Sequence, residues 1–178
     1  MTANRSPLRS VCLGAALLGV ALLAPAATEA QDARIGPSGL EVPRWISLKF
    51  DKVNARAGPG DDHRLVWVYT VRSLPVQVIQ ETVDWRRVCD PDGGLAWVHK
   101  RTTNGERTAM NLQPQPLPLV ASPSPGAAVR GFWVPRSLGQ LKQCKAGWCQ
   151  IQVRDATGWV RQGAVWGGKQ GPVCRRPG

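Results

Sequence analysis

The sequence predicts an all-β protein made of two tandem small β-barrels that follow a cleaved signal peptide. Short runs of β-branched and aromatic residues, separated by turns rich in Gly and Pro, fill the chain from residue 44 onward. No segment of this region shows the 3.6-residue periodicity of an amphipathic helix. The order of runs and turns in residues 44–107 is repeated, with changes, in residues 108–168. Many short strands between regular turns favour small barrels over a sheet covered by helices.

The first thirty residues have the composition of a secretory signal peptide. Arg5 and Arg9 supply positive charge, Val11–Ala24 is apolar, and Pro25–Ala30 offers small residues for a signal peptidase. We expect cleavage after Ala30, which predicts a periplasmic or secreted mature protein.

Other interpretations of this segment fit its sequence less well. Cleavage after Ala26 is the alternative site. An uncleaved anchor would need about 20 apolar residues, and the apolar stretch is shorter. A lipoprotein would need small residues leading up to Cys12, and this lipobox is missing. No later segment is apolar enough to span a bilayer, so we expect a soluble mature chain without a transmembrane segment.

The chain is strongly basic, with a formal net charge of +11. Removing residues 1–30 leaves about +10 on the mature chain. Such a charge attracts polyanions. An exported protein meets membrane phosphates or acidic cell-wall polymers, so nucleic acid is not an expected partner. The same charge would also keep a small domain soluble, and both interpretations remain open.

The first copy follows residues 31–43, which are small, polar or rich in Gly and Pro and are predicted to be a flexible lead-in. It spans residues 44–107 and ends in a polar connector, residues 100–107. Its five expected strands are Trp45–Phe50, Leu65–Val71, Val76–Gln80, Trp85–Cys89 and Leu95–His99.

A distinctive loop, V-N-A-R-A-G-P-G at Val53–Gly60, follows the first of these strands. Gly58 and Gly60 can adopt positive φ, and Pro59 between them fixes its own φ, so a sharp turn is predicted here. Asn54 can hydrogen-bond to its local backbone, as Asn does in turns.

This loop, a hydrophobic hairpin, D-W-x-x-V at Asp84–Val88 and W-V at Trp97–Val98 occur in an order that resembles the bacterial SH3-like (SH3b) family. The resemblance covers Arg44–Lys100 well and Leu119–Trp166 less completely. It is carried by Val53, Asn54, Arg56, Gly58, Pro59, Gly60, Trp85, Val88, Trp97 and Val98. It implies two tandem SH3-like β-barrels. The motif residues with a mainly structural role are Val53, Asn54, Arg56, Gly58, Pro59, Gly60, Trp97 and Trp159.

Family members with a known role bind cell-wall peptides or serve as targeting and protein-contact modules. The resemblance therefore implies a non-enzymatic binding domain. The second copy has Ala121–Gly126 in place of the motif, so a motif-dependent site is expected only in the first copy.

The second copy spans residues 108–168 and is followed by a tail, residues 169–178. Its matching segments are Leu119–Gly126, Val129–Val134, Leu138–Gln143, Gly147–Ile151 and Thr157–Val160. The Trp67/Trp133, Trp85/Trp148 and Trp97/Trp159 pairs are separated by 66, 63 and 62 residues. Separations that drift slightly are typical of a duplicated fold with altered loops.

Four cysteines remain in the mature chain, and an even number in an exported protein favours disulfides. A two-residue turn at Ala146-Gly147 would place Cys144 opposite Cys149 in a non-hydrogen-bonded pair, where side chains approach most closely. The sequence therefore predicts a Cys144–Cys149 disulfide.

The same positions of the first copy hold Glu81 and Arg86, an opposite-charge cross-strand pair. A covalent pair in one copy would thus replace an ion pair in the other. Cys89 and Cys174 are left, and their pairing would tether the C-terminal tail to the first copy.

Aromatic residues supply the candidate ligand-binding groove, because SH3-type domains bind extended peptides along such grooves. Trp85 lies beside the basic pair Arg86-Arg87, the best combination for an acidic or carboxylate-bearing ligand. The alternative is that each Trp packs in a small core. The candidates are Trp67, Tyr69, Trp85, Arg86, Arg87 and Trp133.

Catalytic and metal-binding patterns are missing. The two histidines, His63 and His99, lie in no nucleophile or zinc motif, and the cysteines are expected to pair with one another. No cofactor and no metal are expected, and the protein is not expected to be an enzyme.

Three functional hypotheses follow. The first is an exported module that binds a peptide or peptidoglycan fragment. The second is a structural or protein-interaction protein that docks an acidic envelope partner through its basic surface. The third, a cell-wall hydrolase, lacks candidate residues. The salt dependence of binding distinguishes the first two hypotheses. Contacts between exposed charges weaken as ionic strength rises, whereas stacking in an aromatic groove should persist. The oligomeric state is left open.

Overall fold

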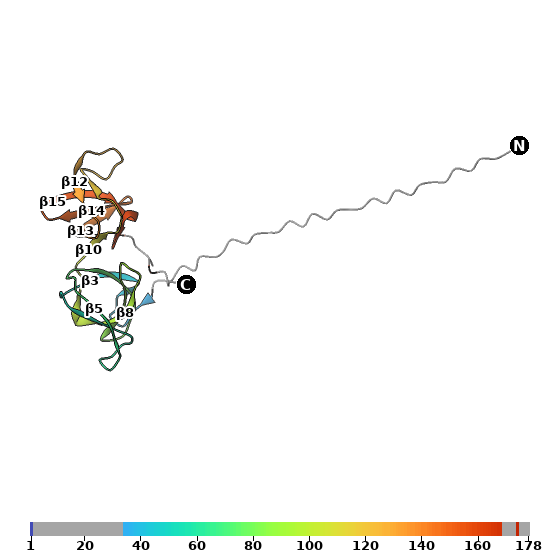
Figure 1. Cartoon of the computed structure of the whole chain (residues 1–178), viewed down its shortest axis with the longest axis vertical. Coiled ribbons are helices and arrows are strands. Elements are labelled where there is room, and N and C mark those ends of the chain that lie inside the picture. The colour runs from blue at the N-terminus through green and yellow to red at the C-terminus, as the bar shows by residue number, and fades with distance from the viewer. Residues whose placement is uncertain (2–33, 169–173, 175–178) are drawn as a thin grey trace.

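The computed structural model describes residue 1, residues 34–168 and residue 174. The predicted signal peptide and the tail residues 169–173 and 175–178 lie outside the described residues. The described chain forms two seven-stranded antiparallel sheets and one short hairpin. Each large sheet makes one small barrel, and the two barrels form the two lobes of Figure 1. The prediction of an all-β protein with two tandem barrels is confirmed.

Barrel 1 (residues 44–107) contains seven strands and one turn of 3-10 helix. Its elements are β3 (Arg44–Leu48), β4 (Val53–Arg56), β5 (Leu65–Tyr69), β6 (Pro75–Glu81), β7 (Trp85–Cys89), β8 (Leu95–His99), η1 (Lys100–Thr102) and β9 (Thr103–Asn104).

Barrel 2 (residues 108–168) has the same set of elements. They are β10 (Thr108–Asn111), β11 (Leu117–Val120), β12 (Val129–Trp133), β13 (Leu138–Lys145), β14 (Trp148–Val153), β15 (Ala156–Arg161), η2 (Gln162–Ala164) and β16 (Val165–Trp166).

The strand order proves the duplication. The sheets run β5-β4-β8-β7-β6-β3-β9 and β12-β11-β15-β14-β13-β10-β16, which is one topology used twice. The register shifts match as well, since β4 and β11 are irregular at Ala55/Arg56 and Leu119/Val120. One predicted correspondence is wrong: Trp133 pairs with Leu117 as Tyr69 pairs with Val53, so Trp133 is the counterpart of Tyr69 and not of Trp67.

The structure has more strands than the five expected in barrel 1. The Val53–Arg56 part of the motif is itself the strand β4, and the predicted polar connector contains η1 and β9. The predicted flexible lead-in, residues 31–43, contains a hairpin of β1 (Arg34–Ile35) and β2 (Glu41–Val42). This hairpin is held against barrel 1 because Ser38 donates two hydrogen bonds, from its backbone N and its Oγ, to the Glu81 carboxylate.

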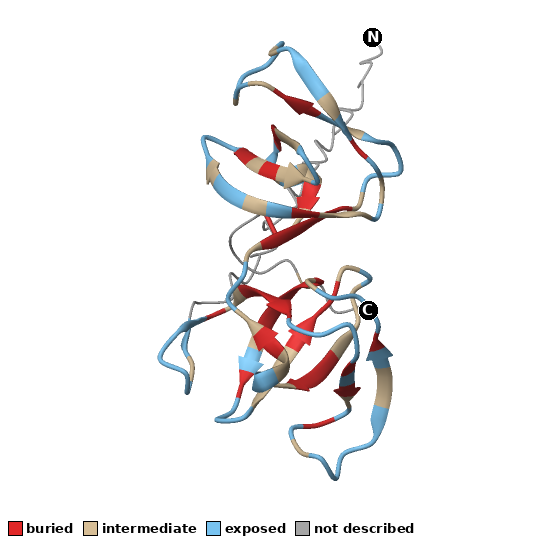
Figure 2. Ribbon diagram, turned by 90° about the vertical axis from the view of Figure 1, so that its left-hand side faces the viewer, coloured by how far each residue is buried: buried red, intermediate tan, exposed pale blue. Residues whose placement is uncertain are grey.

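The core of barrel 1 extends into barrel 2. Met110 is buried in the same apolar cluster as the barrel 1 valines, and Leu138 and Trp166 pack against that cluster. Buried segments line both lobes where the two barrels meet in Figure 2. The shared cluster gives the two barrels a common apolar interface, which the hydrophobic effect stabilises.

Polar contacts reinforce this interface. The Trp166 indole donates a 2.7 Å hydrogen bond to the Pro75 carbonyl, and its ring meets the edge of Trp45 at a centroid distance of 4.9 Å. The Thr108 hydroxyl donates to the Ser73 carbonyl at 2.7 Å. The two barrels are therefore in direct contact and are not separated by a linker.

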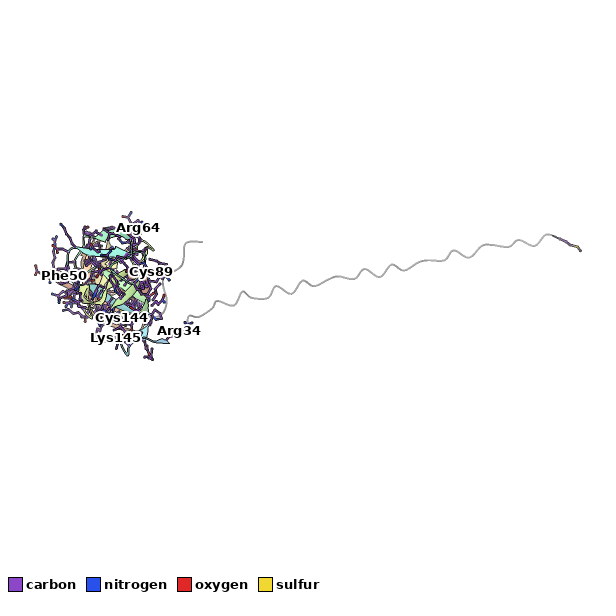
Figure 3. All side chains as sticks on the ribbon, turned by 90° about the horizontal axis from the view of Figure 1, so that it is seen from below. Arg34, Phe50, Arg64, Cys89, Cys144 and Lys145 are labelled. Atoms are coloured by element: carbon purple, nitrogen blue, oxygen red, sulfur yellow. A yellow bond between two sulfur atoms is a disulfide. The ribbon has the colours of Figure 1, made fainter. Side chains whose placement is uncertain are left out.

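Both predicted disulfides form. Cys144 and Cys149 are cross-strand partners with a Cα–Cα distance of 4.0 Å, beside a turn with positive φ at Ala146 and Gly147. Cys89 is bonded to Cys174, which ties the described end of the chain to barrel 1. Figure 3 labels Cys89 and Cys144, one cysteine of each bridge. Within residues 34–168, no helix has the length and apolar character needed to cross a membrane.

Candidate functional site

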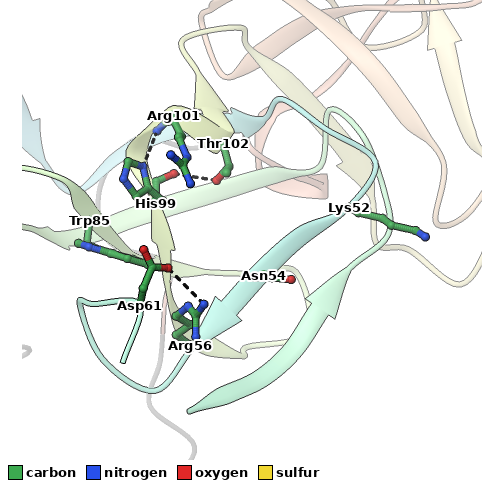
Figure 4. A pocket seen from close by; sticks show the side chains of 8 residues that line it. All are labelled: Lys52, Asn54, Arg56, Asp61, Trp85, His99, Arg101 and Thr102. Carbon is green, nitrogen blue, oxygen red and sulfur yellow. Dashed lines mark hydrogen bonds and ion pairs between the residues drawn. The ribbon is translucent and has the colours of Figure 1, made fainter. Parts of the chain in front are cut away.

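The best candidate site is an open groove of about 160 Å³ on the outer face of barrel 1, shown in Figure 4. Its walls come from β4 and the residue before it, the β4–β5 loop, the first residue of β7, the last residue of β8 and η1. We call it the cationic groove, and it is lined by Lys52, Asn54, Arg56, Asp61, Trp85, His99, Arg101 and Thr102.

Strand pairing brings the aromatic part of the groove together. Successive residues of a strand face opposite sides of the sheet, and directly paired residues face the same side. Trp85 pairs with His99 across β7 and β8, and their rings meet edge to face at 5.2 Å. The groove therefore has a flat aromatic wall with an imidazole beside it.

Arg56 is fixed by the loop that follows it. One guanidinium nitrogen donates to the His63 carbonyl at 2.8 Å, and another lies 3.2 Å from the Asp61 carboxylate. The predicted positive φ at Gly58 and Gly60 is wrong, because neither glycine adopts it. Glycine is required for close approach instead: a Cβ on Gly58 would lie 2.5 Å from the His63 ring. The motif thus builds one wall of the groove.

The other wall is held by a histidine cap. The His99 Nδ1 atom accepts a 3.2 Å hydrogen bond from the backbone N of Arg101, and the Thr102 hydroxyl donates to the His99 carbonyl at 2.7 Å. These bonds orient η1 so that the Arg101 side chain lines the groove. Because Nδ1 is the acceptor, neutral His99 carries its proton on Nε2.

The charge of the groove is positive. Lys52, Arg56 and Arg101 supply three cations, and Asp61 is the single lining carboxylate and is paired with Arg56. No described residue forms an ion pair with the Lys52 ammonium or the Arg101 guanidinium. The groove can therefore hold an anionic group beside the Trp85 ring.

Barrel 2 does not repeat this groove. The counterpart of Trp85 is Trp148, and the Arg161 guanidinium lies over its ring at 4.0 Å. Val120 stands at the position of Arg56 and packs with Trp148 and Trp159 in a small buried cluster. The aromatic face that is open in barrel 1 is covered in barrel 2, which agrees with a motif-dependent site in the first copy only.

The predicted ligand-binding residues separate into two groups. Trp85 lines the groove, and Arg87 lies on the same outer face, where it pairs with Trp97. Arg86 is on the opposite face of β7 with buried Val88, and it donates to the Thr103 hydroxyl while lying 3.8 Å from Glu81. Burial lowers the pKa of the Arg86 guanidinium, with a further contribution from Arg44. The structure thus gives Arg86 a structural position among Glu81 and Thr103, and contact of Arg86 with ligand stays a prediction.

The other three aromatic candidates are part of the cores. Trp133 is 0 % exposed, and Tyr69 is 8 % exposed. Trp67 packs against the barrel 1 core, with its ring edge to face with Tyr69 at 5.9 Å. Trp133 and Tyr69 cannot stack on a ligand without unpacking the core, so the structure gives them a packing role. Trp67 is only partly buried, and its contact with ligand stays a prediction.

Tyr69 has a specific partner that explains its burial. Its hydroxyl donates a 3.1 Å hydrogen bond to the Asp90 carboxylate, which also accepts from the backbone N of Asp92 and of Gly94. Burial raises the pKa of the Tyr69 phenol well above its ordinary range, and the negative charge of Asp90 adds to this shift. The phenol anchors the Asp90–Gly94 turn.

Replacing Tyr69 with Phe is expected to lower the free energy of unfolding by about 1–2 kcal/mol, since it removes one hydrogen bond to a buried carboxylate. Ligand binding should be unchanged, because the phenol does not line the groove. Urea unfolding followed by tryptophan fluorescence measures the first quantity. Loss of binding in a folded Tyr69→Phe protein would contradict the structural role.

Five groove residues were missed by the sequence interpretation: Lys52, Asp61, His99, Arg101 and Thr102. His99 could have been found, because the turn of residues 90–94 joins two five-residue strands and so pairs Trp85 with the last residue of the next strand. Arg101 and Thr102 lie in η1, within the residues that the sequence predicts to be a polar connector. Among the described residues, no group of three or more His, Cys, Asp or Glu side chains is arranged to hold a metal ion.

A small barrel with an aromatic groove between its long loop and its 3-10 helix has the architecture of a binding module. A family profile described as the bacterial SH3 domain matches residues 49–105 and 113–167, and the chain belongs to this family. The predicted resemblance is confirmed for both copies. Bacterial SH3 domains are generally non-catalytic binding modules and are often associated with the cell wall.

Two solved structures resemble the chain, NlpC2 and NlpC1 from Trichomonas vaginalis, each at 13 % sequence identity and a TM-score of 0.33. The matches cover 70 % and 75 % of this chain and 48 % of each of those proteins, so the chain spans about half of their length. A TM-score at this level is too low to carry a structural argument. Comparison with curated proteins finds no match.

Proposed function

We propose that the chain is a non-enzymatic exported binding protein whose cationic groove holds a carboxylate-bearing segment of a cell-wall peptide. The observation that carries this proposal is the Trp85 ring in an open groove that is also lined by Lys52 and Arg101, two cations with no ion-pair partner among the described residues. A planar guanidinium matches a carboxylate, and an aromatic wall holds the adjacent extended chain. Peptidoglycan stem peptides present carboxylates along a short flexible chain, which suits a groove of this size.

Two further observations support an exported, non-catalytic role. The four cysteines outside the predicted signal peptide are bonded in pairs, as is usual in an oxidising compartment. The same bonds leave none of these thiols free to act as a nucleophile. His63 packs beside Gly58, and His99 caps η1, so both histidines have structural positions.

The test is co-sedimentation of residues 31–178 with purified peptidoglycan sacculi at low and high salt. The variants are Trp85→Ala and the double variant Lys52→Gln/Arg101→Gln. We expect each to weaken binding about tenfold, as is typical of a central contact in a small interface. The wild type should keep most of its binding at high salt, because ring stacking is not screened.

The control is Arg72→Gln, which removes a charge from an exposed turn outside the groove. It should bind like the wild type. Equal losses in the control and in the groove variants, or binding that vanishes in salt, would contradict the proposal and favour docking through the general basic surface. A soluble stem peptide should compete with sacculi for the wild type.

A further inference from the structure

Barrel 2 carries an excess of positive charge. Residues 108–168 contain six Lys or Arg and one acidic residue, Asp155. Asp155 lies in the turn between β14 and β15, which is flanked by the paired residues Val153 and Ala156. Two of the cations, Lys145 and Arg161, lie at the other end of these strands, about 17 Å away along a six-residue strand.

These two cations share one outer face. Lys145, Trp148 and Arg161 are direct partners across β13, β14 and β15, which lie side by side in Figure 1. Directly paired residues face the same side of a sheet, so all three side chains leave the barrel together. Neighbouring strands are about 4.8 Å apart, which places the two cationic residues about 10 Å from each other at the backbone.

Tryptophan rings hold both cations in place. Arg161 lies over Trp148 at 4.0 Å, and the Lys145 ammonium lies 5.1 Å from the centre of the Trp159 ring. A guanidinium that stacks on a ring uses its face and keeps its N–H edges free. No ion pair or side-chain hydrogen bond within the described residues engages the Lys145 ammonium or the Arg161 guanidinium. The two rings therefore orient the Lys145 and Arg161 side chains and leave their N–H groups free to donate hydrogen bonds to a ligand.

Amides complete this face. Gln143 and Gln150 are paired across β13 and β14, and the Gln143 amide nitrogen donates to the Gln150 oxygen at 2.9 Å. This contact leaves the Gln143 oxygen as an acceptor and the Gln150 nitrogen as a donor. Phosphates and carboxylates only accept hydrogen bonds, whereas sugar hydroxyls also donate them. The amide pair therefore matches hydroxyl groups, and the cations match acidic groups.

We propose that this face, formed by Gln143, Lys145, Gln150 and Arg161 on their tryptophan supports, is a second binding site that takes an anionic polysaccharide. Acidic groups of the sugar chain lie at Lys145 and Arg161, and hydroxyls lie between them on the glutamine amides. The proposal is independent of the cationic groove, because it uses residues of barrel 2 only.

The test measures binding of residues 31–178 to alginate, a uronic-acid polysaccharide, by isothermal titration at moderate salt. Neutral dextran and inorganic polyphosphate are the comparison probes, since dextran lacks charge and polyphosphate lacks hydroxyls. We expect binding to alginate that is at least severalfold tighter than binding to polyphosphate of equal charge, and no binding to dextran. The double variant Lys145→Gln/Arg161→Gln should lose about tenfold or more in alginate affinity, because charged hydrogen bonds are removed.

Two controls separate this site from general electrostatics. Arg130→Gln/Arg154→Gln removes the same charge from exposed residues of barrel 2 outside the face and should bind alginate like the wild type. Gln143→Ala keeps both cations and should weaken alginate binding but not polyphosphate binding. Trp85→Ala is measured beside them because the cationic groove also takes carboxylates, and only a loss caused by Lys145→Gln/Arg161→Gln reports on the face of barrel 2. Equal affinity for alginate and polyphosphate, equal losses in both double variants, or no binding would overturn the proposal.

Discussion

Replacing Cys174 with Ser is expected to lower the free energy of unfolding by about 4 kcal/mol. The bridge from Cys89 closes a loop with a sequence separation of 85, and a cross-link over such a length restricts the unfolded chain strongly. Cys89 is fully buried, and its thiol can remain in place as a small apolar group. Urea unfolding of residues 31–178, followed by tryptophan fluorescence, measures the change.

The second disulfide is the internal comparison for this prediction. Cys144 and Cys149 are separated by 5 residues, so the same entropic argument assigns about 2 kcal/mol to their bridge. The double variant Cys144→Ser/Cys149→Ser should therefore lose about half as much stability as Cys174→Ser. A larger loss of stability in Cys144→Ser/Cys149→Ser than in Cys174→Ser, or no loss in Cys174→Ser, would contradict the prediction. Either result would show that the entropy of the unfolded chain does not set the stability that the Cys89–Cys174 bridge contributes.

The long-range bridge acts together with the interface between the barrels. Trp166 donates to the Pro75 carbonyl, and Met110 is buried in the barrel 1 core. These contacts and the Cys89–Cys174 bond all oppose separation of the barrels. Unfolding is therefore expected to be a single transition in the wild type, and loss of the bridge is the change that would first allow the barrels to unfold separately.

The fold was largely predictable because its turns and strands are specified by short, local stretches of sequence. Gly- and Pro-rich turns, β-branched runs and the repeated Trp spacing predicted two barrels, and Ala146-Gly147 predicted the turn beside Cys144–Cys149. The 3-10 helix η1 was not predictable in this way, since three residues show no periodicity. The β1–β2 hairpin was missed because its docking depends on Ser38 and Glu81, which are 43 residues apart.

The candidate site was predictable in part. The main error concerned which face of β7 each side chain occupies. Val88 is the buried residue of the D-W-x-x-V motif, and Arg86 faces the same side of β7. The motif alone thus implied that Trp85 and Arg87 face outward and Arg86 inward. Trp133 was assigned to the wrong partner because the matching strands of the two barrels are offset by 64 residues (Tyr69 to Trp133), two fewer than the Trp67/Trp133 spacing of 66.

The buried Glu81 carboxylate lies close to two arginines, Arg44 and Arg86. Glu81 has a side chain that is 1 % exposed, and it lies 2.5 Å from the Arg44 guanidinium. Ser38 donates to it from the N-terminal hairpin, and Arg86 lies 3.8 Å away on the paired strand. Burial alone would raise the pKa of Glu81, but the hydrogen bonds from Arg44 and Ser38 outweigh it and hold the pKa below its ordinary value of 4.5.

Glu81→Gln is expected to lower the free energy of unfolding at pH 7 by about 3 kcal/mol, because it leaves Arg44 and Arg86 facing each other without a counter-charge. Since the folded-state pKa is depressed, this contribution is present in full above the unfolded-state pKa and is lost as the pH falls through the folded-state value. The difference between wild type and variant should therefore shrink in acid, below the ordinary value of 4.5. Urea unfolding at pH 7 and in acid measures it, with the exposed Glu41→Gln as the matched control. A difference that stays constant or grows in acid would show that the Glu81 charge does not hold the hairpin, β6 and β7 together.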